Sequence, residues 1–232
     1  VPRRAVPRQQ RVIFRPRLEG AGKYTKRKLL GKGTFGRVYL TRCVDDTKLY
    51  ALKQVVGVGK ALQMKENQAH PELLQALKEV EVMRITNHPN IVSFKEAYIS
   101  LKGNLSIVMA FCEGGDLGDV IKTCKRNGEH LGESRLLRIV VQSLLALQFM
   151  HSKHVYHRDL KPQNVLLASR DLVKLADFGL SKVMDHTNAI AKTAVGTPYY
   201  MSPEICNNST YDSGSDVWSL GCILYAMLTT KL

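Results

Sequence analysis

The sequence lacks the features of a secreted, membrane-spanning or fibrous protein. Its five cysteines are odd in number and never spaced as Cys-x-x-Cys, which favours reduced thiols over a disulfide framework. No apolar stretch of the kind found in signal peptides follows the basic start, so we expect no signal peptide. The longest apolar stretch, residues 136–150, contains Arg138 and two glutamines, and is too short and too polar to span a bilayer. We therefore expect a cytoplasmic protein, with nuclear or cytoskeletal association as alternatives.

Acidic residues are also scarce. The 232 residues include 34 Lys+Arg and only 20 Asp+Glu, a formal charge of +14 that suggests an anionic partner. Residues 1–28 hold ten basic side chains and one acidic side chain, so this short segment carries +9. We expect residues 1–23 to form a flexible basic arm that either binds an acidic partner or acts as a solubilising tail. No specific nucleic-acid recognition is expected.

What the sequence does contain is an ordinary globular composition, with 44% hydrophobic residues and no internal repeat. Its first half is rich in short β-forming runs. Residues 28–56 predict an antiparallel three-strand meander, and two more strands are expected at 91–100 and 105–111. Pro71 suits the first turn of a helix placed between these groups of strands.

The second half is mainly helical. The run from Ser134 to His151 has an apolar surface so wide that we expect this helix to be buried. An apolar helix is also predicted at 215–228, after a long loop at 180–203. The sketch is a β-rich lobe followed by a helical lobe, joined near residues 111–115.

A glycine-rich motif, G-x-G-x-x-G-x-V, follows the first predicted strand. A dinucleotide site would require a helix directly after the glycines, whereas a strand at 38–40 follows here. The backbone N–H groups of this turn could therefore cover the phosphates of a nucleotide, although a plain flexible turn has the same pattern. The motif consists of Gly31, Lys32, Gly33, Thr34, Phe35, Gly36, Arg37 and Val38.

Four further elements follow in order. Lys53 ends the third strand, where a lysine on its own could simply extend to solvent. The segment 157–164 reads H-R-D-L-K-P-Q-N, and D-F-G follows at 177–179. Residues 196–204 read G-T-P-Y-Y-M-S-P-E.

These five elements together resemble the catalytic domain of eukaryotic protein kinases. The resemblance covers residues 24–232 and implies an α+β, bilobal fold. It divides the domain into an N-lobe at 24–110, a hinge at 111–115 and a mostly helical C-lobe at 116–232. The segments 111–117, 196–204 and 218–222 look most like NIMA-related kinases.

The resemblance implies transfer of the γ-phosphate of ATP to serine or threonine hydroxyls, with Mg²⁺. Asp159 would accept the proton of the substrate hydroxyl, and Lys161, typical of serine/threonine kinases, would neutralise the γ-phosphate. Asn164 and Asp177 would supply oxygens to Mg²⁺. Lys53 would contact the α- and β-phosphates.

Lys53 also needs a carboxylate partner on the first helix. Glu79 and Glu81 are the choices, and the family's spacing to His88 selects Glu79. The gap between Lys53 and its partner is longer than is usual in the family. We therefore interpret residues 57–70 as an inserted loop.

The adenine is expected between apolar side chains of the two lobes, with hydrogen bonds from the hinge backbone. Asp116 would either accept from the ribose hydroxyls or cap a helix, and both roles are compatible. The remaining candidate residues are Leu30, Val38 and Ala51 above the base, Leu166 below it, and Ala110 and Cys112 in the backbone.

Regulation is implied by the same resemblance. Arg158 would dock a phosphorylated activation loop, with Thr193 as the candidate phosphorylation site. Thr197 would help to shape the serine/threonine acceptor site. Asp216 resembles the helix carboxylate that braces the catalytic loop.

The alternative is a catalytically silent scaffold or an inactive fragment that acts by binding. The presence of all the catalytic residue types favours an active kinase. The family fold continues with further helices, and the arginine that normally pairs with Glu204 would lie in that part. We therefore expect this sequence to be a fragment of a longer kinase domain.

Overall fold

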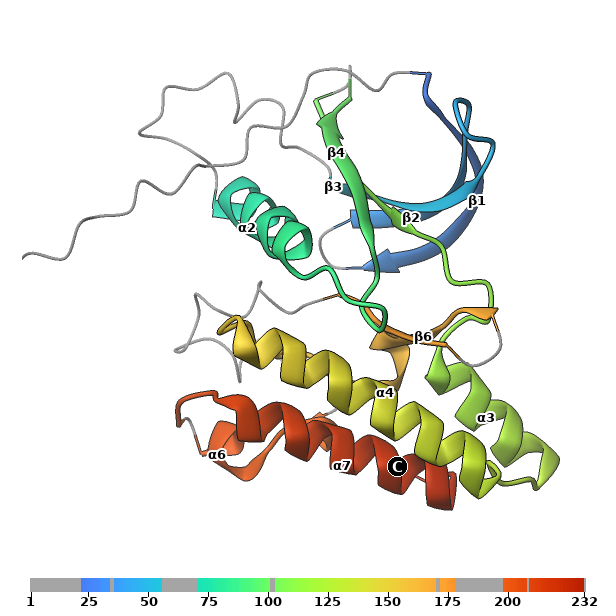
Figure 1. The fold of residues 1–232 in the computed structure, drawn as a ribbon, viewed down its shortest axis with the longest axis vertical. Helices are drawn as coiled ribbons and strands as arrows, with labels where there is room; N and C mark the ends of the chain where they lie inside the picture. Colours follow the sequence, from blue (N-terminus) through green and yellow to red (C-terminus); the bar gives the residue numbers. More distant parts are fainter. Residues whose placement is uncertain are drawn as a thin grey trace, which may run out of the picture.

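The computed structural model describes residues 22–33, 36–55, 71–100, 103–169, 172–177, 198–207 and 209–231. Its N-terminal part is built on a five-stranded antiparallel sheet with the strand order β1-β2-β3-β5-β4 (Figure 1). Short apolar runs separated by turn residues, with several β-branched and aromatic side chains among them, account for most of these strands, and β5 is buried at five of its six positions. The strands are β1 (Tyr24–Gly33), β2 (Gly36–Cys43), β3 (Leu49–Val55), β4 (Phe94–Ile99) and β5 (Leu105–Ala110).

Both faces of the sheet carry apolar side chains. On one face, Ala51, Ile107 and Met109 join the main core, together with Val80 and Met83 of helix α2 (Pro71–Ile85). The opposite face carries a smaller cluster built on Tyr24, Leu52, Tyr98 and Val108, with Cys43. The sheet therefore presents one face to the rest of the molecule and closes the other with its own aromatic residues.

The C-terminal part is mostly helical and lies below the sheet in Figure 1. A two-stranded antiparallel ribbon, β6 and β7, lies between the sheet and the helices. The elements are α3 (Leu117–Asn127), α4 (Glu133–Ser152), η2 (Pro162–Asn164), β6 (Val165–Leu167), β7 (Val173–Leu175), η6 (Pro198–Tyr200), α6 (Pro203–Cys206) and α7 (Ser213–Thr229). The prediction of an α+β, bilobal kinase-like fold is confirmed.

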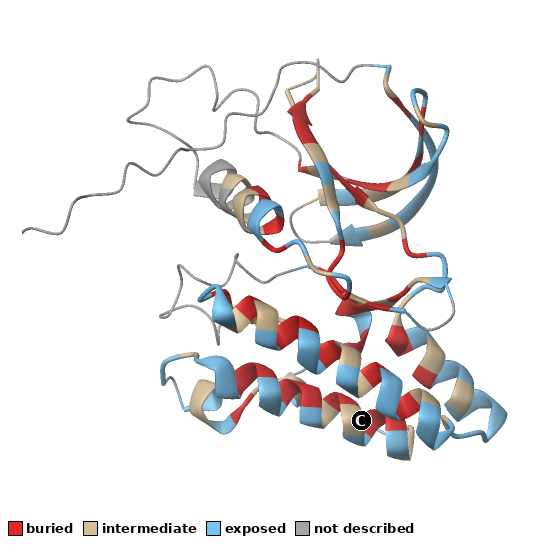
Figure 2. Cartoon of the chain, viewed as in Figure 1, coloured by how far each residue is buried: buried red, intermediate tan, exposed pale blue. Residues whose placement is uncertain are grey.

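Helix α4 corrects one expectation. Its inner face, with Ile139, Leu147 and Met150, is buried as predicted. Its outer face carries Leu137, Val141, Leu144 and Leu145, which are between 43% and 52% exposed. The helix contacts α7 and β7 on its inner side, and nothing among the described residues covers the outer side (Figure 2). The prediction that this helix is buried is therefore wrong for its outer face. A wide apolar surface is buried all round only where neighbouring elements pack on each side of it, and the described elements pack on the inner side alone.

Two smaller points concern the predicted elements. Strand β4 begins at Phe94 rather than Ile91, because Ile91 makes only an isolated bridge to Leu175 of β7. Along the described part of the chain, no helix has the length and apolar character needed to cross a membrane. The inserted loop proposed at 57–70 lies outside the described residues.

Candidate functional site

The glycine-rich segment joins the end of β1 to the start of β2. Gly33 pairs with Gly36 in this hairpin, and Thr34 and Phe35 lie outside the described residues. A Cβ atom on Gly36 would lie only 2.0 Å from the carbonyl oxygen of Gln54 in β3, so only glycine fits there. Gly31 has open space instead.

Other residues of the motif lie on the two strands and keep their polar ends at the surface. Lys32 pairs with Arg37 across the hairpin, and both are exposed. Val38 is half-buried and faces Lys53 of the neighbouring strand. The structure thus brings the glycine-rich hairpin directly beside the strand lysine.

Lys53 lies between two carboxylates from different parts of the chain. Its Nζ is 2.6 Å from Glu79 Oε1 on α2 and 3.1 Å from Asp177 Oδ1 after β7. Burial disfavours the charged ammonium, but Asp177 and Glu79 outweigh this effect and raise the pKa of Lys53 above its ordinary value. Of the two candidate partners, the described contacts of Lys53 include Glu79 and not Glu81.

A second polar group surrounds Asp159 in the loop after α4. Asp159 Oδ2 accepts hydrogen bonds from Lys161 Nζ at 2.8 Å and from Asn164 Nδ2 at 3.2 Å. Asn164 Nδ2 also donates to the carbonyl oxygen of Asp159 at 2.7 Å. Asp159 and Lys161 remain partly accessible, with 28% and 39% of their side chains exposed. A carboxylate and an ammonium are therefore held together at the surface of this loop.

The oxygens available to a metal ion belong to Asn164 and Asp177. Among the described residues, no donor reaches Oδ1 of Asn164 or Oδ2 of Asp177. Amide and carboxylate oxygens are the hard ligands that Mg²⁺ prefers, and Mg²⁺ usually combines one or two such ligands with water and phosphate oxygens. No cluster of three or more histidine, cysteine or acidic side chains suited to a metal occurs in the described part. The donor set fits Mg²⁺ held jointly with phosphates.

The candidate adenine-binding residues come from strands of the sheet, from the segment after β5 and from β6. Val38, Ala51, Cys112 and Leu166 all belong to the main apolar core or pack against it. Leu30 is the exception, since it lies within β1 and is 42% exposed. The Cys112 thiol is buried, and burial raises its pKa. Ala110 ends β5, just before the chain turns into the helical part.

Asp116 caps helix α3. Its Oδ1 accepts a hydrogen bond from the backbone N–H of Asp119 at 3.0 Å, so the helix-capping role is confirmed. Asp116 also bridges to Leu166 of β6, and partial burial raises the pKa of its carboxyl group. The helix cap uses Oδ1 of Asp116. Because Oδ2 is left for a ribose hydroxyl, the two candidate roles remain compatible.

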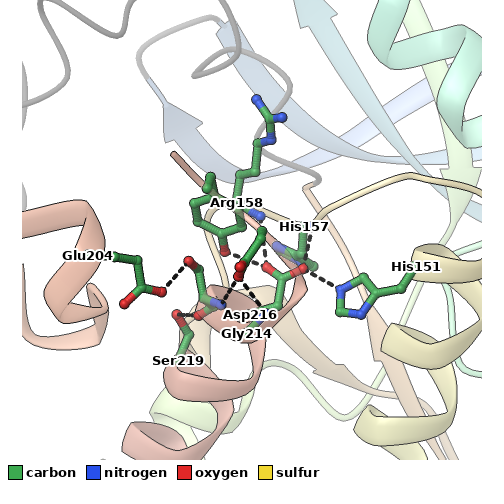
Figure 3. A network of polar contacts seen from close by, with 10 residues as sticks. His151, His157, Arg158, Glu204, Gly214, Asp216 and Ser219 are labelled. Atoms are coloured by element: carbon green, nitrogen blue, oxygen red, sulfur yellow. Dashed lines mark hydrogen bonds and ion pairs between the residues drawn. The ribbon is translucent and has the colours of Figure 1, made fainter. Parts of the chain in front are cut away.

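Asp216 of α7 contacts four donors beside the loop at 157–164 that carries Asp159 (Figure 3). Its Oδ2 accepts from the backbone N–H of His157 at 2.9 Å and lies 2.7 Å from His151 Nε2. Its Oδ1 accepts from the backbone N–H of Arg158 at 3.1 Å and from the hydroxyl of Tyr211. Burial opposes its charge, but the contacts with His151 and Tyr211 outweigh burial and lower the pKa of Asp216.

The participation of His151 and Tyr211 was not predicted from the sequence. His151 is on α4, 65 residues from Asp216, and nothing in its local pattern indicates this contact. Tyr211 precedes α7 by two residues, and tyrosines near a helix start carry no specific signal. The packing of α4 against α7 brings His151 to Asp216, whereas Tyr211 reaches it from the segment directly before α7.

The remaining candidates divide into described and undescribed residues. Arg158 lies in the loop at 157–164 with a positive φ of 66°, whereas Thr193 and Thr197 are outside the described residues. Glu204 of α6 accepts a hydrogen bond from Ser215 Oγ at 2.6 Å (Figure 3). The carboxylate is thus joined to α7.

Comparison with known proteins gives a consistent result. A family model described as "Protein kinase domain" matches residues 24–232. The chain is 40% identical over 208 residues to the serine/threonine-protein kinase Nek4 of Mus musculus, covering 90% of this chain and 25% of that protein. It is 40% identical over 209 residues to Nek1 of Mus musculus, covering 90% of this chain and 16% of that protein. Nek2 of Homo sapiens is 41% identical over 204 residues, 85% of this chain and 44% of that protein. The chain thus spans less than half the length of these relatives.

Proposed function

The chain belongs to the protein kinase family, and on that premise we propose that it transfers the γ-phosphate of ATP to serine or threonine hydroxyls of protein substrates. The expected likeness to NIMA-related kinases is confirmed by relatives that are named serine/threonine-protein kinases. The observation that carries the proposal is the convergence of strand, helix and loop on Lys53. Glu79 and Asp177 are 26 and 124 residues away from Lys53 in the sequence, yet both contact its ammonium group.

In-line phosphoryl transfer needs placement of the reactants and neutralisation of charge rather than covalent help. Lys53 supports this because its charge is held in place by Glu79 and lies beside the glycine-rich hairpin, where it can meet the α- and β-phosphates. The backbone N–H groups of the hairpin would cover the phosphates. Gly36 allows the close approach of β2 to β3 on which the hairpin depends.

On the other side of the site, Asp159 would orient the substrate hydroxyl and accept its proton. Lys161 contacts the same carboxylate at 2.8 Å, so its charge would reach the γ-phosphate as the hydroxyl approaches. Asn164 holds the Asp159 loop through its amide nitrogen and leaves its oxygen for a cation. One short segment thus supplies base, cation and metal ligand.

Asn164 and Asp177 would hold Mg²⁺, which when bound neutralises charge on the phosphates. The adenine would lie against Val38, Ala51 and Leu166, with backbone hydrogen bonds from residues 110–112. Asp116, through the oxygen that the helix cap does not use, would accept from the ribose.

Regulation by phosphorylation is a further part of the proposal. Arg158 would receive a phosphate on Thr193, and Thr197 would shape the acceptor site. The basic arm, residues 1–23, would bind an acidic partner with an affinity that falls steeply with salt, and deletion of residues 1–20 would abolish that binding.

The full chain with Mg²⁺-ATP and a mixed set of serine, threonine and tyrosine peptides tests the proposal. We expect labelled phosphate on serine or threonine peptides only. Asp159→Asn should lower the rate by roughly 10²-fold or more, because it removes the positioned base. Asp119→Asn, which removes an exposed carboxylate on α3, is the matched control and should leave the rate unchanged. Equal rates for wild type and Asp159→Asn would refute the mechanism.

A further inference from the structure

The conformation of Arg158 is unusual for a residue with a long side chain. Its φ of +66° lies in the left-handed region, which costs a non-glycine residue free energy. Asp216 holds this turn by accepting the backbone N–H groups of His157 and Arg158. The Arg158 side chain extends away from the Asp216 carboxylate, with the guanidinium at its far end (Figure 3).

Two aromatic rings meet this guanidinium. Its central carbon lies 5.9 Å from the ring centroid of Tyr156 and 5.8 Å from that of Tyr211. The two ring centroids are 6.3 Å apart, with the planes inclined at 51°. Both distances are within the range of roughly 6 Å at which a cation is attracted by an aromatic face. We call Tyr156 and Tyr211 the aromatic seat of Arg158.

The seat attracts the cation without neutralising it. Among the residues that the structure describes, no carboxylate lies within ion-pair distance of the Arg158 guanidinium, although Asp216 is directly beneath its backbone. The guanidinium therefore keeps its full charge and its planar set of N–H donors, which match the oxygens of a phosphate group. An arginine fixed by rings also loses less side-chain entropy when it binds an anion than a freely moving one.

Each ring is itself held in place. The Tyr211 hydroxyl donates to Asp216 Oδ1, and burial, together with Asp216, raises the pKa of Tyr211, so the phenol stays a donor. The Tyr156 ring lies 5.6 Å from the ring of His151, whose Nε2 contacts the other oxygen of Asp216. The seat is thus fixed to the same carboxylate that holds the backbone of Arg158.

We propose that Tyr156 and Tyr211 are positioning residues that hold the Arg158 guanidinium ready for a phosphorylated side chain. The proposal deepens the regulatory part of the proposed function and rests on it. It predicts that the ring faces, rather than the hydroxyl of Tyr156, set the affinity of Arg158 for phosphate.

The test is nuclear magnetic resonance of the Arg158 side chain in the full chain, assigned with Arg158→Lys and titrated with O-phospho-L-threonine. In the wild type we expect an upfield ring-current shift of the Arg158 side-chain protons and a further change on titration. Tyr156→Leu should reduce the ring-current shift and raise the dissociation constant by about two- to fivefold, the size of one exposed cation–π contact. Tyr156→Phe, which keeps the ring, should behave like the wild type.

Tyr39→Leu is the matched control, because it removes a ring under a different cation, Lys26, 3.9 Å from its centroid. It should leave the Arg158 signals and the phosphothreonine affinity unchanged. Tyr211→Phe keeps the ring but not the hydroxyl and should retain the ring-current shift. The proposal is overturned if Tyr156→Leu leaves shift and affinity unaltered, or if Tyr156→Phe loses as much as Tyr156→Leu. Because the readout needs no catalysis, an inactive enzyme with an intact seat would refute the proposed activity and not the seat.

Discussion

Two ionic centres hold the site together, and they are built in opposite ways. At Lys53, one cation lies between two carboxylates supplied by α2 and by the segment after β7. At Asp216, one buried carboxylate lies among four donors, of which two are backbone N–H groups. In the first centre, the charge of the ammonium group is balanced by the opposite charges of two carboxylates. In the second centre, the charge of the carboxylate is stabilised by hydrogen bonds.

The difference indicates different tasks. The Asp177 side chain is 51% exposed, so the Lys53 centre is open to water and to a polyanion that could exchange partners with it. The Asp216 carboxylate has no exposed surface, and it fixes the backbone of His157 and Arg158. This difference fits the proposed function, in which the Lys53 centre would meet the phosphates, whereas the Asp216 centre fixes the backbone at the start of the loop at 157–164.

Removal of Asp216 should have the largest effect on stability. Asp216→Ala leaves up to four buried or partly buried donors without an acceptor, each costing up to about 1–3 kcal/mol, and we expect a non-additive total of about 3–5 kcal/mol in the free energy of unfolding. Asp216→Asn keeps one acceptor oxygen and should lose less. Urea denaturation measures both variants. If Asp216→Ala lowered the free energy of unfolding by no more than an ordinary surface substitution does, the Asp216 centre would not have the structural task that distinguishes it from the Lys53 centre.

Lys53→Met should reduce phosphate transfer strongly and stability only slightly, the reverse of the emphasis expected for Asp216→Ala. The variant keeps a side chain of similar length but removes a preorganised charge from the phosphates, and we expect phosphate transfer to fall by roughly 10²-fold or more. Its loss of stability should be smaller than that of Asp216→Ala, because Glu79 keeps partial access to water and can take up a proton. Lys53→Arg is the control for charge alone. Full activity of Lys53→Met would place the chemistry elsewhere.

A third pair of variants tests the hairpin that lies beside Lys53. Gly36→Ala places a methyl group 2.0 Å from the Gln54 carbonyl, so β2 must shift from β3, at a cost of about 2 kcal/mol. Gly31→Ala meets no atom within 4 Å and should change the unfolding free energy by less than about 0.5 kcal/mol. Thermal unfolding compares the two. Equal melting temperatures would show that the hairpin tolerates a side chain at both positions.

The two centres also differ in how far the sequence predicts them. The strands of the sheet are predictable, because short runs of β-forming residues between turns carry information along the chain. The Lys53–Glu79 pair is predictable only through the family's spacing to His88. Asp216 is indicated only by its resemblance to a family motif. Its partner His151 cannot be predicted in this way, since the α4–α7 packing that brings it to Asp216 has no local signature. Tyr211 lies five residues before Asp216, but no pattern in that segment indicates the contact.

Burial is predictable only in part for the same reason. The apolar surface predicted for α4 includes Leu147, which is a core residue. It also includes Leu137 and Val141, which are equally apolar but more than half exposed. An apolar pattern indicates which surfaces of a helix can be buried. The arrangement of the neighbouring elements decides which of these surfaces is buried in the folded protein.

The smallest expected effect is the pH dependence of the Asp216 centre. Because the contacts with His151 and Tyr211 lower the pKa of Asp216 in the folded state, the carboxylate binds its proton less readily folded than unfolded. Its contribution to stability is therefore complete above the unfolded-state value of about 4, and is lost as the pH falls through the lower, folded-state value. Asp216→Asn cannot titrate at this position, so the difference in unfolding free energy between wild type and Asp216→Asn should be constant near neutral pH and narrow below about pH 4. Urea denaturation across this range measures the difference, with Asp119→Asn, which removes an exposed carboxylate, expected to match the wild type at every pH. A gap that stays constant to the acid limit would mean that Asp216 titrates alike in both states, and that its four donors organise the loop without stabilising the charge.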